Sequence, residues 1–132
     1  MLTRMLRREC EMKIKYMCFA MCVSFSAQVL AGGKSVEREI SMESSAGYVA
    51  EHCIWVKPGN VLDYETKAPF AVNFNIHFHT ANDVVYPVKE DKVLEHEGQV
   101  VVESKGEYCF MWKNIAQQNA DYKIALHYKI TK

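Results

Sequence analysis

The chain has 132 residues, of which 49% are hydrophobic and 24% are charged, and its sixteen basic and sixteen acidic residues cancel. These values predict one globular domain with enough apolar side chains to form a core. They argue against a nucleic acid or another polyanion as partner, because binding to phosphates requires an excess of positive charge.

Residues 1–31 are predicted to be an N-terminal extension followed by a secretory signal peptide. The segment Met12-Lys-Ile-Lys15 is a basic start, residues 16–23 form an apolar run, and small residues precede Gly32. Together these are the three parts of a secretory signal. We expect Met12 rather than Met1 to be the start, and cleavage after Ala31. An uncleaved membrane anchor is the alternative, although the apolar run is short for a permanent span.

Cleavage at that point would leave two of the five cysteines, Cys53 and Cys109. Two cysteines in an exported domain predict one disulfide between them, whereas in a cytosolic protein they would be free thiols. The sequence therefore predicts a periplasmic or secreted protein that has no membrane span after cleavage and carries a candidate Cys53–Cys109 disulfide.

The remainder divides into a polar leader, 32–46, and a domain, 47–132. The leader is expected to be an edge strand, an ordered arm or a disordered segment. Pro87 restricts the segment 84–88 to a sheet edge or a bulge, and 89–97 is expected to form a loop or a short helical turn. Turn residues separate the strands that we expect at 47–56, 61–66, 71–80, 84–88, 99–103, 108–113 and 122–130.

The clearest strand is 72–79, where apolar and polar residues alternate strictly. This period of two places one apolar face on a core and leaves His77 and His79 together on the polar face. The fold class is therefore predicted to be all-β, an antiparallel β-sandwich or jelly-roll of seven to eight strands preceded by an N-terminal signal helix. The expected core comprises Leu62, Tyr64, Phe74, Ile76, Phe78, Tyr108, Phe110, Trp112, Ile124 and Leu126.

Three spaced motifs resemble the GOLD domain, a β-sandwich of early-secretory cargo receptors and some lipid-transfer proteins. They are Val56-x-Pro-Gly-x-x-Leu-x-Tyr64, Phe74-x-Ile-x-Phe78 and Gly106-x-Tyr-x-Phe-x-Trp-x-Asn114. The resemblance implies a compact antiparallel domain that recognises proteins or lipid surfaces, and it supplies no catalytic residues. The cargo-receptor role is not carried over, because no transmembrane helix or coiled coil follows the motifs; a bacterial exported protein fits better.

Polar faces of the expected strands carry the candidate site residues. His77 and His79 could bind copper or zinc with Cys109 or Met111, since imidazole, thiolate and thioether ligands together select copper. A Cys53–Cys109 disulfide competes with this hypothesis, because a bonded sulfur is no longer a thiolate. Asn73, Asn75 and His127 are the other residues expected on a face that binds a ligand or partner.

No phosphate-binding glycine loop, nucleophile elbow or His-Glu-x-x-His motif occurs in the sequence. We therefore predict a non-enzymatic exported module that recognises a protein or a small ligand of the cell envelope through its polar sheet face and the loop 80–87. A periplasmic copper- or zinc-binding protein is the alternative, and a subunit that completes an envelope complex is a third hypothesis.

Overall fold

The computed structural model describes residues 32–132, so the signal peptide, signal helix and anchor expected within 1–31 lie outside the described residues. Within 32–132 no helix has the length and hydropathy needed to cross a membrane. This part of the chain forms six strands: β1 (Ser35–Met42), β2 (Val49–Val56), β3 (Val61–His79), β4 (Val84–Val101), β5 (Gly106–Asn114) and β6 (Tyr122–Thr131).

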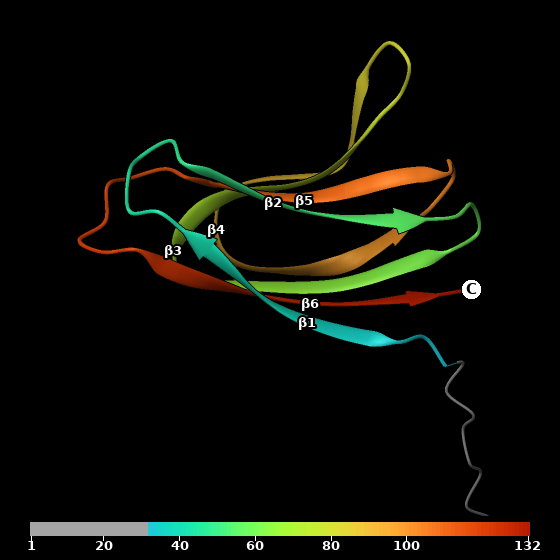
Figure 1. Ribbon diagram of the computed structural model, residues 1–132, viewed down its shortest axis with the longest axis horizontal. Coiled ribbons are helices and arrows are strands. Elements are labelled where there is room, and N and C mark those ends of the chain that lie inside the picture. The colour runs from blue at the N-terminus through green and yellow to red at the C-terminus, as the bar shows by residue number, and fades with distance from the viewer. Residues whose placement is uncertain (1–31) are drawn as a thin grey trace, which may run out of the picture.

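All strand pairs are antiparallel, and they form one continuous sheet in the order β1-β6-β3-β5-β2, with β4 on β3. The first part of β3, residues 61–67, pairs with β6, whereas residues 72–78 pair with β5. Figure 1 shows the consequence: β3 and β4 bend together, and the sheet curls into two layers. One layer contains β2 and β5, and the other contains β1 and β6.

The bend of β3 lies where the sequence predicts a break, at Lys67-Ala-Pro-Phe70. Pro69 has no backbone N–H to donate, and the pairing of β3 with β4 shifts register between Lys67 and Val72. On β4, Lys92 takes the left-handed backbone conformation, with φ of 56°. The break is thus a local irregularity within a continuous strand, because a bulge bends a strand without ending it.

The antiparallel all-β class is confirmed, and a single curled sheet takes the place of the expected sandwich or jelly-roll of seven to eight strands. The expected strands 61–66 and 71–80 fall in β3, which ends at His79, and the expected strands 84–88 and 99–103 fall in β4, which ends at Val101. The prediction of a loop or helical turn at 89–97 is wrong, because this segment also belongs to β4 and pairs with β3 despite its charge. The expected leader, 32–46, contains β1, which is an edge strand.

The core lies between the two layers of the curled sheet. The predicted core residues are buried, except that Phe78 is half-buried and stacks on Tyr108 with ring centres 4.6 Å apart. The Trp112 indole donates a hydrogen bond to Thr66 Oγ1 across the core, at 3.0 Å. Met42 of β1 is also fully buried, so the leader contributes to the same core.

Candidate functional site

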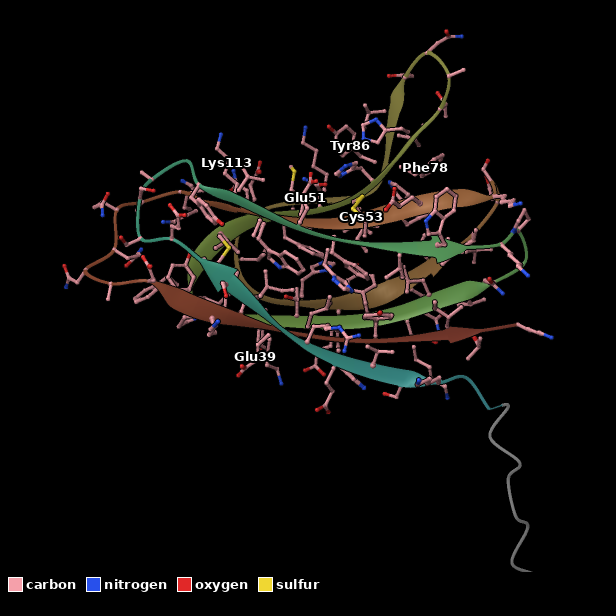
Figure 2. All side chains as sticks on the ribbon, in the orientation of Figure 1. Glu39, Glu51, Cys53, Phe78, Tyr86 and Lys113 are labelled. Atoms are coloured by element: carbon pink, nitrogen blue, oxygen red, sulfur yellow. A yellow bond between two sulfur atoms is a disulfide. The ribbon has the colours of Figure 1, made fainter. Side chains whose placement is uncertain are left out.

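The outward side of the layer formed by β2, β5, the end of β3 and the start of β4 carries most of the predicted site residues. We call it the disulfide face; Figure 2 shows it on the upper side, with Glu51, Cys53, Tyr86 and Lys113 labelled. The side chains on this face include Glu51, Cys53, Trp55, Asn75, His77, His79, Tyr86, Cys109 and Met111.

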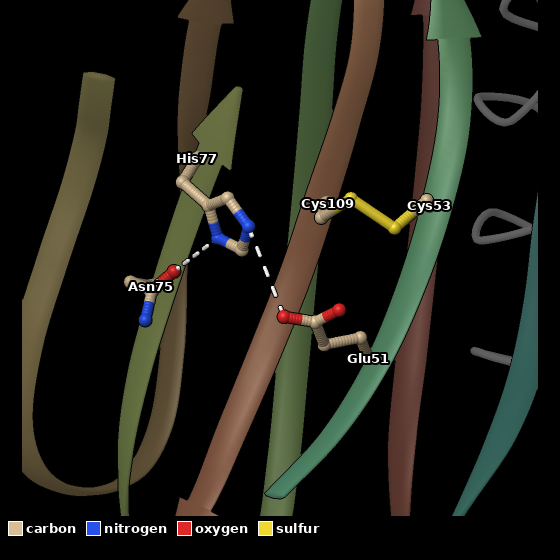
Figure 3. The surroundings of a disulfide bond; sticks show 5 residues. All are labelled: Glu51, Cys53, Asn75, His77 and Cys109. Carbon is tan, nitrogen blue, oxygen red and sulfur yellow. Dashed lines mark hydrogen bonds and ion pairs between the residues drawn. A yellow bond between two sulfur atoms is a disulfide. The ribbon is translucent and has the colours of Figure 1, made fainter. Parts of the chain in front are cut away.

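Strand register places Cys53 directly opposite Cys109, and Cys109 directly opposite His77. The two sulfur atoms are bonded at 2.05 Å across strands whose Cα atoms are 4.0 Å apart. The predicted disulfide is therefore confirmed, and Figure 3 shows it beside the His77 ring. The disulfide holds β2, an edge strand, to the middle of the sheet.

The same bond changes the expected metal site. Cys109 Sγ is bonded to Cys53 and cannot act as a thiolate ligand. Glu51 and the two cysteine sulfurs lie within 4.8 Å of one another, but the two sulfurs are already bonded to each other. Met111 lies in the next row, opposite both Asn75 and Glu51. The Cys109 thiolate, the softest of the expected ligands, is thus removed, and the Glu51 carboxylate faces the His77 ring instead.

His77 faces outward, as the alternation predicts, but it is only 5% exposed. The ring of Tyr86, from β4, lies 5.6 Å from the His77 ring, and the disulfide lies on the other side. The His79 ring is 5.3 Å away and perpendicular to it. An outward position on a strand therefore does not expose this imidazole, because side chains from neighbouring strands cover it.

Both nitrogens of the His77 ring face an oxygen atom. Nδ1 donates a hydrogen bond to Asn75 Oδ1 at 2.8 Å, and Nε2 lies 3.8 Å from Glu51 Oε1 (Figure 3). Burial lowers the pKa of His77 below 6.5, Glu51 opposes this effect, and His79 adds to it. At neutral pH the ring is therefore neutral, with its proton on Nδ1 and the lone pair of Nε2 directed toward the Glu51 carboxylate.

Two large exposed aromatic side chains lie near opposite edges of the disulfide face, Trp55 on β2 and Tyr86 on β4. Trp55, two residues along β2 from Cys53, is 70% exposed, and Tyr86 is 46% exposed. The Lys89 ammonium group lies 5.5 Å from the centre of the Tyr86 ring. The disulfide face spans four strands, β2, β5, β3 and β4, which is a width of about 14 Å at the usual strand spacing. This face therefore combines two strands that a disulfide links with exposed aromatic side chains near its edges.

The structure separates the remaining candidate residues. Asn73 is on the disulfide face, where its Oδ1 accepts a hydrogen bond from the backbone N–H of Lys92 at 3.1 Å and holds the β4 bend. His127 lies on the outward side of the other layer, paired in register with Glu37 and Glu65. A shallow depression of about 440 Å³ lies beside it. His127 therefore cannot act together with Asn73 and Asn75.

Sequence reasoning missed Glu51, Trp55 and Tyr86 as site residues. The first two share the parity of Cys53 on β2, so a predicted disulfide already implies that they lie on its face. Tyr86 could not be assigned, because a register shift in β4 opposite His77 decides which way it points.

Two further histidines that the sequence left unassigned, His52 and His96, turn toward the core. The Tyr64 hydroxyl and His96 Nδ1 are hydrogen-bonded at 3.1 Å, and burial, reinforced by Glu90, raises the pKa of Tyr64 to about 12. This hydrogen bond joins β3 to β4 on the inward side of the sheet.

No known family and no curated protein matches the sequence. Among solved structures, the fold is similar to that of PliG, a periplasmic lysozyme inhibitor of g-type lysozyme. The Aeromonas hydrophila protein has 14% identity and a TM-score of 0.56, covering 76% of this chain and 89% of its own. The Salmonella Typhimurium protein has 13% identity and a TM-score of 0.51, covering 76% and 90%. At these identities the likeness establishes a shared all-β fold.

Proposed function

We propose that this chain is an exported, non-enzymatic module that binds a protein through the disulfide face and the adjoining hairpin tip, residues 80–83. The observation that carries the proposal is the exposure of Trp55, which is 70% exposed on the outward side of β2. Exposing so large an apolar group to water is unfavourable, and tryptophan and tyrosine are the residues most enriched at the centres of protein interfaces.

The rigidity of the face supports the same proposal. The disulfide and the register of β2 with β5 fix the backbone beneath Trp55, so little conformational entropy is lost there when a partner docks. The disulfide also suits an oxidising compartment, which agrees with a periplasmic or secreted location. The structures with a similar fold are periplasmic proteins that act on another protein, which favours a protein partner over a small ligand.

A g-type lysozyme is the first candidate partner, because it is the enzyme that the two similar structures inhibit. The resemblance to GOLD domains stays a prediction, and it too implies recognition of a protein or a lipid surface. Neither comparison supplies a catalytic residue, and the proposal requires none.

The test is the affinity of the disulfide-bonded protein for a purified g-type lysozyme, together with the inhibition of that enzyme. Trp55→Ala should weaken binding by roughly 30-fold or more, the loss expected for an interface residue worth about 2 kcal/mol. Val101→Ala is the matched control, because Val101 is 64% exposed on the other layer of the sheet. Absence of binding would exclude this partner, and equal binding by the Trp55→Ala variant would exclude this face.

A further inference from the structure

We propose that the partner protein contributes one extended segment, which pairs with the free edge of β2 as an additional antiparallel strand. The inference rests on the proposed function and deepens it, because it names the kind of segment that is recognised. β2 pairs with β5 only, and within residues 32–132 no strand pairs with its other side. β1, also an edge strand, lies in the other layer of the curled sheet (Figure 1).

The spacing of one residue pair shows which way the backbone groups of β2 point. In antiparallel strands, opposite residues that exchange no hydrogen bonds have Cα atoms about 4.5 Å apart, against about 5.5 Å for those that do. The Cα atoms of Cys53 and Cys109 are 4.0 Å apart, so Cys53 directs its N–H and C=O groups away from β5. The Tyr48 carbonyl, at the opposite parity, accepts a hydrogen bond from the Asn114 N–H at 2.8 Å, as this alternation requires.

Three more residues of β2 therefore present backbone groups at the free edge. Bonded and non-bonded pairs alternate along a strand, so Val49, Glu51 and Trp55 point their N–H and C=O groups the same way as Cys53. Their side chains also share its parity and stand on the disulfide face. An added strand would gain affinity from these backbone groups and selectivity from the side chains at alternate positions.

β2 is the least protected of the strand edges within residues 32–132. Proteins usually guard free edges with charged side chains, proline or bulges. β1 carries Glu37, Arg38 and Glu39, and β4 carries Pro87 together with register shifts in its pairing with β3. β2 has no proline, pairs with β5 without a shift along its whole length, and carries Glu51 as its one carboxylate. It is the edge at which a strand adds with the fewest obstacles.

Glu51 and Trp55 define the chemistry of the segment. The Glu51 side chain is 45% exposed and the His77 ring beside it is neutral, so a lysine or arginine opposite Glu51 would supply the missing positive charge. An apolar residue opposite Trp55 would precede that basic residue by four positions, since the strands are antiparallel. A second copy of this chain fits less well, because β2 has no lysine or arginine to place beside Glu51.

The probe is a synthetic heptapeptide, acetyl-Ile-Thr-Val-Thr-Lys-Thr-Val-amide, added to the disulfide-bonded protein and followed in proton–nitrogen spectra. Its first residue would lie opposite Trp55 and its lysine opposite Glu51. We expect saturable shifts and slower hydrogen exchange at the backbone N–H groups of Glu51, Cys53 and Trp55. The N–H groups of His52 and Ile54 bond to β5 and should keep their exchange rates.

Charge reversal separates this pairing from nonspecific adhesion. A peptide with glutamate in place of lysine should bind about two- to fivefold more weakly, the usual effect of an exposed ion pair, and Glu51→Lys should reverse the preference. Glu51 is exposed, so this variant should fold. Glu107→Gln is the matched control, because Glu107 is an exposed carboxylate on β5, away from the free edge, and should leave the affinity unchanged.

The proposal is overturned if no saturable shift occurs up to roughly 5 mM peptide, or if the lysine and glutamate peptides bind equally. Protection of the same N–H groups that grows with protein concentration, without peptide, would assign the edge to a second copy and overturn it too. No lysozyme enters these measurements, so their failure leaves the proposed function untouched. Lysozyme binding that leaves the N–H groups of Glu51 and Trp55 unprotected would refute the added strand alone.

Discussion

At the scale of single residues, the histidines of this chain differ in how deeply they lie in the curled sheet. His77 is outward but covered, His79 and His127 are exposed, and His52 lies on the inward side of β2. The His52 ring is within 5.7 Å of Tyr128 and 6.5 Å of Phe110, and it faces Arg38 from β1. Polarity alone therefore does not predict which imidazole is accessible.

The position of His52 predicts a pH dependence of stability. Burial, and then the positive charge of Arg38, lowers its pKa below 6.5. The unfolded chain therefore takes up a proton first as the pH falls. Stability is at its full value above 6.5 and is lost as the pH falls through 6.5 toward the lower pKa of the folded state.

Urea unfolding in the presence of EDTA, compared at about pH 8 and about pH 5, measures this loss. His52→Phe keeps an aromatic ring on Phe110 and Tyr128 and should reduce the loss of stability at the lower pH. His127→Gln, at an exposed position, should leave the loss as in the wild type. A His52→Phe variant that loses as much stability as the wild type would show that this residue does not cause the dependence.

At the scale of elements, the long β3–β4 hairpin joins the two layers, and its packing depends on one glycine. Gly98 of β4 lies opposite Tyr64 of β3, and a Cβ at this position would lie 2.9 Å from the Tyr64 hydroxyl oxygen. That hydroxyl is held by its hydrogen bond to His96, so it cannot move away without loss.

Gly98→Ala should therefore destabilise the protein by about 1–3 kcal/mol, the usual cost of overpacking. The matched control is Gly106→Ala, because a Cβ at Gly106 meets nothing within 4 Å. Its effect should stay within about 0.5 kcal/mol. Chemical denaturation of both variants measures the difference, and equal stabilities would mean that the Tyr64 ring moves aside freely.

The disulfide sets the stability of the β2 edge of the sheet. It links residues 56 positions apart, and cross-links that close loops of this length typically contribute about 2–4 kcal/mol. The double variant Cys53→Ala/Cys109→Ala should keep the fold, since the core lies on the other side of these strands, and should lose stability of this size in urea. Wild-type stability in the double variant would indicate that register and packing alone hold β2 in place.

Sequence alternation predicted the core and the strand faces well, because the period of two is a local property of the chain. It placed Phe74 and Ile76 inward and His77 outward, and the cysteine count led to the disulfide. Alternation could not predict that strands continue through their bulges, since the segment around Pro69 reads as a break. Nor could it predict the burial of His77, which depends on Tyr86 from another strand and a shift in register.

At the scale of the whole molecule, the two outward faces differ in chemistry. The face around His127 carries charged side chains such as Glu37, Glu39, Glu65 and Lys67. The disulfide face carries the exposed aromatic side chains of Trp55 and Tyr86 beside the disulfide bond. Figure 2 shows these faces on opposite sides of the curled sheet. The proposed contact with another protein lies on the disulfide face alone.

Site-specific photo-crosslinking in the cell that produces the protein tests this assignment most directly. A photoreactive residue in place of Trp55 should give one discrete cross-linked protein, and the same residue in place of Val101, exposed on the other layer, should give none. A cross-link at position 101 with none at position 55 would contradict the central claim, because the partner would then contact the face that lacks the disulfide.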